Sequence, residues 1–231
     1  AENQEGYRNL MKLSSLSYTE GFYYKPRIDE ELLRAYSGGL IASSACLAGE
    51  IPSLILAGRL KAAEAKALEY RELFGPERFY LELQDHGLEE QRLVNRELVA
   101  LSRRHGIPLV ATNDVLYHSR QRKILQDVLT CIREKCTLAG AGFRLQANAE
   151  RNLKSPAEME QLFEEYPEAL DAALEIAGDC RFSLDELSYQ YPEETLEPGL
   201  SPYQDLERRV WAGADWRYPG GVPEAVRRQI R

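Results

Sequence analysis

The stretch Pro-Leu-Val-Ala-Thr-Asn-Asp-Val-Leu-Tyr-His, residues 108–118, decides the fold class of this chain. Residues 109–111 form a short, continuous apolar run, and Pro108 before it stops a preceding helix. Such a run is typical of a parallel strand that is covered on both faces. Ligands and catalytic groups of α/β proteins gather at the carboxyl ends of these strands, so Asn113 and Asp114 are candidate site residues. The alternative is that both residues only turn the chain and cap the next helix.

Strand and helix signals alternate outward from this stretch, which predicts βα units with parallel strands and hence an α/β fold. Strands are predicted at residues 39–45, 79–83 and 109–111. Helices are predicted at residues 52–58, 60–74, 94–101, 120–134 and 167–178. A further helix is predicted to begin after Ser155, because Pro156 follows it and Glu158 completes a capping box. Residues 140–148 have the composition of a loop.

Apolar residues recur at helical spacing in the predicted helices, with Ala63, Ala67, Tyr70 and Phe74 in helix 60–74 and Val94, Leu98 and Leu101 in the next. In helix 167–178, Leu170, Leu174 and Ala177 are predicted to face inward, and Gly178 to end the helix. In helix 120–134 the apolar residues at this spacing are Ile124, Leu125, Val128, Leu129 and Ile132. Asn113 and Asp114 are therefore expected between a strand end and a helix start, which is the position of a loop that carries function.

Composition limits the class of protein. The chain has 231 residues and 44% hydrophobic content, enough for one core and an appendage. It contains no run of about eighteen apolar residues and no charged-then-apolar leader, so neither a membrane span nor secretion is expected, and a cytoplasmic location is predicted. Reduced thiols are expected, because no CxxC pair occurs among Cys46, Cys131, Cys136 and Cys180. Cys131 and Cys136 are interpreted as packed thiols on one helix rather than as a metal clip.

The net charge argues against a surface that grips nucleic acid by bulk electrostatics. The formal charge is −8 and the sequence pI is about 5.1, whereas such surfaces need clustered lysine and arginine. A modest basic cluster comprises Arg120, Arg122, Lys123, Arg133 and Lys135. Asp127 and Glu134 interrupt it, so a solvated helix face is the preferred interpretation. The chain alone is therefore expected to bind DNA poorly.

Six motifs in order carry a resemblance to a known family. They are Glu5-Gly6-Tyr7-Arg8-Asn9-Leu10, the segment from Ser43 to Pro52, Tyr80-Leu81-Glu82-Leu83-Gln84, Ala111-Thr112-Asn113-Asp114-Val115, Leu125-Gln126-Asp127-Val128-Leu129 and Leu153-Lys154-Ser155-Pro156. Together they resemble the polymerase and histidinol phosphatase (PHP) domain that opens bacterial C-family DNA polymerases, the DNA polymerase III alpha subunits and their error-prone paralogues. The resemblance covers roughly residues 5–231.

Four further segments resemble the error-prone, damage-tolerant branch most closely. They are residues 114–118, residues 131–134, residues 182–187 and residues 217–221. The resemblance implies a partial distorted (β/α)7 barrel of the PHP type, with residues 1–188 as the C-terminal portion of the PHP domain. Beyond Tyr189, prolines at 192, 198, 202, 219 and 223 indicate a linker and an incomplete second unit. By the resemblance, residues 189–231 are this linker and the start of the polymerase palm region, ending before any of its catalytic carboxylates.

Active members of the family hold a cluster of metal ions at the strand ends, and here the resemblance implies a degraded site. Cys46 matches the cysteine ligand and Asp114 the aspartate ligand. The residue two positions after the aspartate is a histidine in metal-binding members, but it is Leu116 here. The other ligands are expected upstream of Ala1. A metal site needs three or four converging ligands, so no catalytic residue, cofactor or catalytic metal is expected in this chain. For the parent enzyme the resemblance implies divalent magnesium, with zinc or manganese as further candidates.

The histidines offer no clear replacement ligand. His118 lies two residues beyond the position of the lost histidine, which moves it onward by about 3.3 Å per extended residue, and it is expected to be a partly exposed loop residue. His86 follows a strand end and is expected to be solvated. His105 ends a helix, where a cation interacts favourably with the helix dipole.

Three functions remain open. The preferred one is a structural PHP scaffold within an error-prone DNA polymerase, a nucleotidyltransferase of DNA replication and damage-induced synthesis. Its partners would be DNA, deoxynucleotides, the rest of the polymerase chain and mutagenesis or replication accessory proteins. The second is a metal-dependent phosphoesterase or 3'-5' exonuclease. The third is a stand-alone α/β small-molecule enzyme in which Asp114 and Glu82 serve as acid and base. An open barrel also predicts an edge strand at residues 39–45 and a marginal or self-associating chain.

Overall fold

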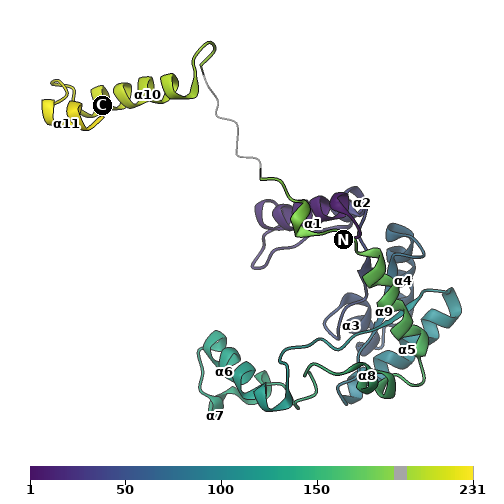
Figure 1. Cartoon of the computed structure of the whole chain (residues 1–231). Coiled ribbons are helices and arrows are strands. Elements are labelled where there is room, and N and C mark those ends of the chain that lie inside the picture. The colour runs from purple at the N-terminus through teal and green to yellow at the C-terminus, as the bar shows by residue number, and fades with distance from the viewer. Residues whose placement is uncertain (190–196, 231) are drawn as a thin grey trace. The chain divides into compact units, whose positions relative to one another are not determined.

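A computed structural model describes residues 1–189 and 197–230, and the chain divides into two compact units. Unit 1 spans Ala1–Glu186, and it contains a parallel sheet surrounded by helices (Figure 1). Unit 2 spans Leu187–Arg231, and its described part contains the helices α10 (Pro202–Arg217) and α11 (Glu224–Ile230). The predicted linker with Pro192 falls largely on residues 190–196, which lie outside the described residues.

The sheet of unit 1 confirms the predicted parallel α/β arrangement. Its strands are β1 (Ala42–Ser43), β2 (Phe79–Leu83) and β3 (Leu109–Ala111), and they pair in the order β1-β2-β3. Both pairs are parallel, with Ser43 opposite Tyr80 and Leu81 opposite Leu109. The first strand is much shorter than the predicted residues 39–45. Gly39 and Ala45 both adopt positive φ values, 68° and 60°, so the chain turns at each end of the predicted strand.

Nine helices accompany the sheet within the described residues of unit 1. They are α1 (Gln4–Thr19), α2 (Glu30–Tyr36), α3 (Glu50–Leu56), α4 (Leu60–Phe74), α5 (Glu89–His105), α6 (Lys123–Glu134), α7 (Leu138–Ala141), α8 (Pro156–Leu162) and α9 (Pro167–Asp179). The capping box at Ser155 is confirmed, since its side chain accepts from the Glu158 amide while Glu158 accepts from the Ser155 amide. The predicted loop at 140–148 instead begins with the end of α7 and a 3₁₀ turn, because the Thr137 side chain caps α7.

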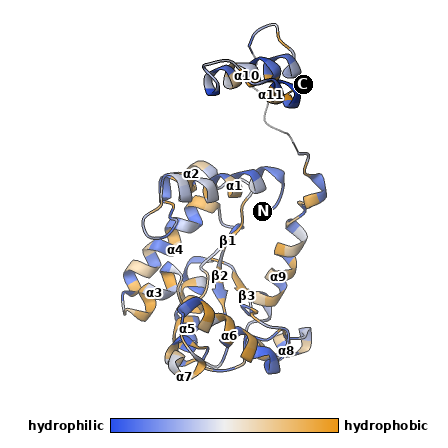
Figure 2. Cartoon of the chain, turned by 90° about the vertical axis from the view of Figure 1, so that its left-hand side faces the viewer, coloured by the Kyte–Doolittle hydropathy of each residue, from blue (hydrophilic) through white to orange (hydrophobic). Residues whose placement is uncertain are grey.

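The two faces of β2 pack against different helices. Phe79, Leu81 and Leu83 are buried in the main core with residues of α3, α4 and α5. The opposite face carries Tyr80, which packs with Val110 of β3 and Ala172 of α9. In Figure 2 the strands accordingly lie between α3 and α4 on one side and α9 on the other. The sheet is therefore covered on both faces, as the continuous apolar strands predict.

The inward face of α9 agrees with the prediction only at Leu170, which packs against the main core. Ala169 and Ala172 are its buried residues, whereas Leu174 is 75% exposed and Ala177 is also exposed. The reason is steric, because small alanine side chains let α9 approach β3 closely and the larger leucine turns outward. Gly178 also lies inside the helix, which continues to Asp179.

Helix α6 presents an exposed apolar face. Its five apolar residues at helical spacing are all exposed, namely Ile124, Leu125, Val128, Leu129 and Ile132. The buried residues of α6 are Asp127, Thr130 and Cys131. Arg120, Arg122, Arg133 and Lys135 are exposed, as predicted, whereas Lys123 is half-buried and pairs with Asp127 at 2.8 Å. Among the residues that the structure describes, no helix is both long and apolar enough to cross a membrane.

We expect the chain to associate with itself at high concentration, because the α6 face and the short edge strand β1 leave apolar and hydrogen-bonding groups exposed. Sedimentation velocity across a concentration series measures this directly. Leu129→Glu places a charge in the middle of the α6 face and should shift the population toward monomer, whereas the same change at exposed Leu174 of α9 should have a smaller effect. A monomer at all concentrations would contradict the expectation.

Candidate functional site

Polar side chains collect where the three strands end. Ser43 closes β1 and Cys46 follows in the next loop, Glu82 and Gln84 belong to the end of β2, and Thr112 follows β3. Because the strands are parallel, these ends share one edge of the sheet. The sequence predicts candidate site residues at this edge, and the structure brings Ser43, Glu82 and Thr112 together there.

Glu82 is the hydrogen-bonding centre of this edge. Its carboxylate accepts from Ser43 Oγ at 2.5 Å, from Gln84 Nε2 at 2.8 Å and from Thr112 Oγ1 at 2.5 Å. The Glu82 backbone amide also donates to Ser44 Oγ at 2.9 Å. The carboxylate is thus held by donors from all three strand ends. It lies on the strand face opposite to the buried Leu81 and Leu83, which is what period-two alternation predicts.

Cys46 lies next to this centre in the loop between β1 and α3. It lines a small cavity of about 10 Å³ together with Glu82 and Gln84, which is roughly room for one water molecule. The Oε1 atom of Gln84 is buried without a hydrogen-bond partner in the described part of the chain. The loop is tightly folded, since the Gly49 amide donates to the Cys46 carbonyl at 2.7 Å.

Asp114 points to a different partner. The Arg151 guanidinium donates to its carboxylate and forms an ion pair with it. Asp114 has a φ of 41°, in the left-handed region that aspartate tolerates better than most residues. A backbone hydrogen bond holds Arg151 beside the segment that follows β3, because the Leu116 amide donates to the Arg151 carbonyl at 2.9 Å. The sequence gives no signal for this pair, because 37 residues separate its members.

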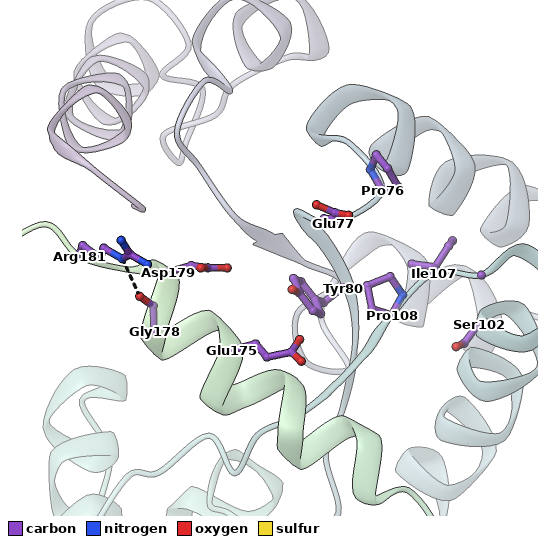
Figure 3. Close-up of a pocket in the computed structure, with 11 residues that line it drawn as sticks. Pro76, Glu77, Tyr80, Ser102, Ile107, Pro108, Glu175, Gly178, Asp179 and Arg181 are labelled. Carbon is purple, nitrogen blue, oxygen red and sulfur yellow. Dashed lines mark hydrogen bonds between the residues drawn. The ribbon is translucent and has the colours of Figure 1, made fainter.

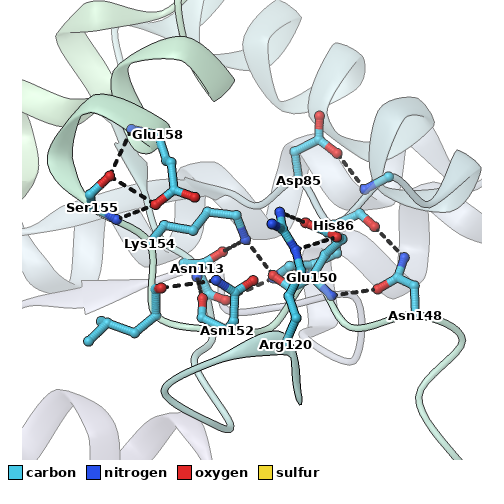
Figure 4. Close-up of polar contacts among 12 residues, drawn as sticks. Asp85, His86, Asn113, Arg120, Asn148, Glu150, Asn152, Lys154, Ser155 and Glu158 are labelled. Atoms are coloured by element: carbon cyan, nitrogen blue, oxygen red, sulfur yellow. Dashed lines mark hydrogen bonds and ion pairs between the residues drawn. The ribbon is translucent and has the colours of Figure 1, made fainter. Parts of the chain in front are cut away.

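A polar network joins the corner after β3 to the segment before α8 (Figure 4). Asn113 donates through Nδ2 to the Asn152 carbonyl at 2.5 Å and accepts from Lys154 Nζ at 2.9 Å. Lys154 also donates to the Glu150 carbonyl, and burial lowers its pKa. Arg120 forms two hydrogen bonds with the Glu150 carboxylate, which lower the pKa of that carboxyl. Asn113 therefore connects the corner after β3 to the segment before α8, rather than only turning the chain.

His86 is buried, contrary to the expectation that it is solvated. Only 1% of its surface is exposed. Its Nε2 lies 2.8 Å from the Asn113 carbonyl and its Nδ1 lies 2.9 Å from Gln91 Nε2. These partners fix a neutral ring that donates from Nε2 to the carbonyl and accepts at Nδ1 from the amide. The His86 carbonyl accepts from Asn148 Nδ2 at 2.6 Å, so this residue also belongs to the network in Figure 4.

The buried state of His86 predicts a pH dependence of stability. Burial lowers the pKa of His86, and the nearby Arg151 and Lys154 lower it further, while Asp114 and the Asn113 carbonyl act in the opposite direction. The unfolded chain takes up a proton near pH 6.5, where the folded chain does not. Unit 1 should therefore lose stability as the pH falls below about 6.5. Thermal melts between about pH 7.5 and 5.5 measure this loss.

Two variants separate His86 from other titrating groups. His86→Gln should flatten the pH dependence, whereas His118→Gln should leave it unchanged, because His118 is exposed as expected. Equal slopes in all three proteins would show that another group controls the stability in this range. His105 is at the end of α5 as predicted, and its Nε2 contacts Glu64 at 2.6 Å.

The predicted thiol pair is only partly as expected. Cys131 is buried on α6, and burial followed by the contact with Cys136 raises its pKa. Cys136 lies beyond the helix end, because Lys135 adopts a left-handed conformation and stops α6. All four cysteines are free, so the thiols are reduced in this structure.

The donors at the strand ends do not by themselves fit a metal cluster. Cys46 and Asp114 follow β1 and β3, which lie on opposite sides of β2 and so are about 10 Å apart as strands. Asp114 is paired with Arg151, and Leu116 offers no donor atom. The described residues contain no group of three or more His, Cys, Asp or Glu side chains that could hold one ion.

The fold and its strand-end site define an α/β protein with a parallel sheet, and comparison with known proteins gives its family. A family model described as "PHP domain" matches residues 1–86. DNA polymerase III subunit alpha of Treponema pallidum is 45% identical over 199 residues, 84% of this chain and 17% of that protein. Error-prone DNA polymerase 1 of Agrobacterium fabrum is 42% identical over 229 residues, 99% of this chain and 20% of that protein.

Error-prone DNA polymerase of Caulobacter vibrioides is 49% identical over 141 residues, which are 61% of this chain and 13% of that protein. The chain thus belongs to the bacterial C-family DNA polymerases, as a segment of their PHP region. Where nearly all of this chain is aligned, it spans about a fifth of the length of the curated relative. Relatives with the alpha-subunit name and with the error-prone name have overlapping identities, so the names do not separate the two branches.

Proposed function

We propose that this chain is a structural PHP segment of an error-prone DNA polymerase, and that it supports the polymerase without carrying out chemistry. The pairing of Asp114 with Arg151 carries the proposal. An aspartate that is to bind a metal must offer its carboxylate, but here a guanidinium occupies it. Leu116, two residues later, adds an apolar side chain where a ligand is needed.

The proposal includes the place of the segment in a larger protein. Residues 1–188 form part of a distorted (β/α)7 barrel, and residues 189–231 link it to the start of the palm region. The parent protein is a DNA-directed DNA polymerase that uses magnesium, binds DNA and deoxynucleotides and acts with accessory proteins in the cytoplasm. The names of the relatives support this parentage. Primer extension tests it: the full-length protein should extend primers across damaged template positions, and the 231-residue chain should not.

A metal-dependent phosphoesterase or 3'-5' exonuclease is the alternative, and metal analysis distinguishes it. We expect the full-length protein to purify without stoichiometric zinc or manganese, and Cys46→Ala and Asp114→Asn to leave its metal content unchanged. The matched controls are Cys180→Ala and Asp171→Asn, which change exposed residues outside the site. Stoichiometric metal that is released by the site variants and retained by the controls would establish the alternative and remove the scaffold proposal.

A stand-alone enzyme with Glu82 and Asp114 as acid and base is disfavoured by their contacts. Glu82 accepts three hydrogen bonds from its neighbours, and Asp114 is paired with Arg151. Acid-base catalysis needs a group within hydrogen-bond reach of a substrate proton. Both carboxylates are instead held within the protein.

A further inference from the structure

A second cavity lies at the opposite end of the strands from the site described above. Its volume is about 820 Å³, within the range of sites that bind small molecules. The segments that enter β2 and β3 contribute Pro76, Glu77 and Pro108 to its wall, and α9 contributes its last turn (Figure 3). Every residue of this wall belongs to unit 1.

The carboxyl ends of three helices border this cavity. Pro76 follows the end of α4, Ser102 and Gly106 belong to the end of α5, and Gly178 and Asp179 to the end of α9. A helix carboxyl end carries a partial negative charge and carbonyl groups without partners inside the helix. The Ser102 and Gly178 carbonyls already accept hydrogen bonds from Gly106 and Arg181, so it is the partial negative charge of the three ends that favours a cation.

Carboxylates reinforce this preference. Glu77, Glu175 and Asp179 line the cavity, and all are exposed at its rim. The only basic residue of the wall is Arg181, whose Nε donates to the Gly178 carbonyl at 3.2 Å. Formal charge at the rim is therefore negative overall.

Tyr80 supplies an independent indication of a ligand. It is only 5% exposed, lines the cavity, and makes no side-chain hydrogen bond among the residues that the structure describes. The Tyr80 hydroxyl opens into the cavity, where a bound donor would take the place of water on its oxygen. Burial raises the pKa of this phenol, and so do Glu175, Asp179 and Glu77, which places these carboxylates close to it. Next to Tyr80 the wall is apolar, with buried Ile107 and half-buried Pro108.

We propose that this cavity binds a small organic polycation of the linear alkyl polyamine class. Ammonium groups at the two ends would meet the rim carboxylates beside the helix carboxyl ends, and one of them would donate to the Tyr80 hydroxyl oxygen. The alkyl chain between them would lie against exposed Pro76 and half-buried Pro108. A hydrated inorganic cation offers nothing to these apolar residues, so the wall favours an organic ligand.

Calorimetric titration of the 231-residue chain with spermidine tests the proposal. We expect one site, and we expect Asp179→Asn and Glu175→Gln each to weaken binding about tenfold through loss of a charged partner. Tyr80→Phe should weaken it several-fold. Asp171→Asn is the matched control, because Asp171 is exposed on the same helix but does not line the cavity.

Three results would overturn the proposal. If Asp171→Asn weakened spermidine binding as much as Asp179→Asn, the ligand would be attracted diffusely to a chain of net charge −8 rather than bound in the cavity. Competition by magnesium at the same concentration as spermidine would mean an inorganic cation. In the unmodified chain, amide NMR shifts on adding spermidine should centre on Gly106 and Gly178, so shifts centred elsewhere would place the ligand outside this cavity. This last measurement needs no variant to fold.

Discussion

Phe79→Ala is expected to lower the free energy of unfolding of unit 1 by about 3–5 kcal/mol, the range for removing a buried phenylalanine. Phe79 begins the central strand β2 and is 1% exposed. Its ring packs against Tyr70 of α4 with centroids 5.6 Å apart. Domains are stable by only about 5–15 kcal/mol, so the loss is large enough to leave much of unit 1 unfolded in a marginal chain.

Chemical denaturation followed by circular dichroism measures this loss. Tryptophan fluorescence is unsuitable for unit 1, because both tryptophans, Trp211 and Trp216, lie in α10 of unit 2. Phe143→Ala is the matched control: the same atoms are removed, but Phe143 is 97% exposed and the change should stay within about 0.5 kcal/mol. Similar losses for the two variants would mean that β2 is not the centre of the core.

Gly49→Ala is expected to destabilise the loop that carries Cys46 by about 1–3 kcal/mol or more. The backbone of Gly49 has φ −62° and ψ 156°, which any residue can adopt, so conformational freedom is not the reason for glycine here. Space is the reason. A Cβ atom at this position would lie 2.1 Å from the Ser44 carbonyl oxygen, a backbone atom that cannot move aside without shifting the end of β1.

The same substitution at Gly178 is the control for this prediction. A Cβ at Gly178 meets no atom within 4 Å, and alanine favours a helix, so Gly178→Ala should leave stability unchanged or raise it slightly. Thermal melting of both variants gives the comparison. Hydrogen exchange then locates the effect, which for Gly49→Ala should appear first in the amides that pair β1 with β2. A Gly49→Ala variant as stable as the parent would show that the backbone of this loop can shift to accommodate a Cβ atom at little cost.

The elements that the sequence predicts well are those fixed by neighbouring residues. The run at 109–111 forms β3 because three consecutive apolar residues can all be buried in a sheet covered on both faces. Ser155 begins α8 because its hydroxyl and the Glu158 side chain satisfy each other's amides within one turn. Predictions fail where packing decides, as for Leu174, which has the right spacing to face inward but is turned out by the close approach of α9 to β3.

The candidate site follows the same division. Its position at the strand ends could be predicted, because parallel strands bring their carboxyl ends to one edge. The partners of its side chains could not. His86 is buried by Gln91 and by the Asn113 carbonyl, which is 27 residues away, and no local pattern distinguishes it from a solvated loop histidine.

The sequence by itself determined the α/β class, the parallel strands, the helices that alternate with them and the membership of the C-family polymerases, since all of these depend on short patterns along the chain; it did not predict α1, α2, α7, α10 or α11. Only the tertiary structure decided what the polar groups do. It pairs Asp114 with Arg151 and surrounds Glu82 with donors from three strand ends. The physical reason is that a charge is neutralised by whichever group folding brings within hydrogen-bonding distance. When the two residues are tens of positions apart, no local sequence pattern indicates that they will pair.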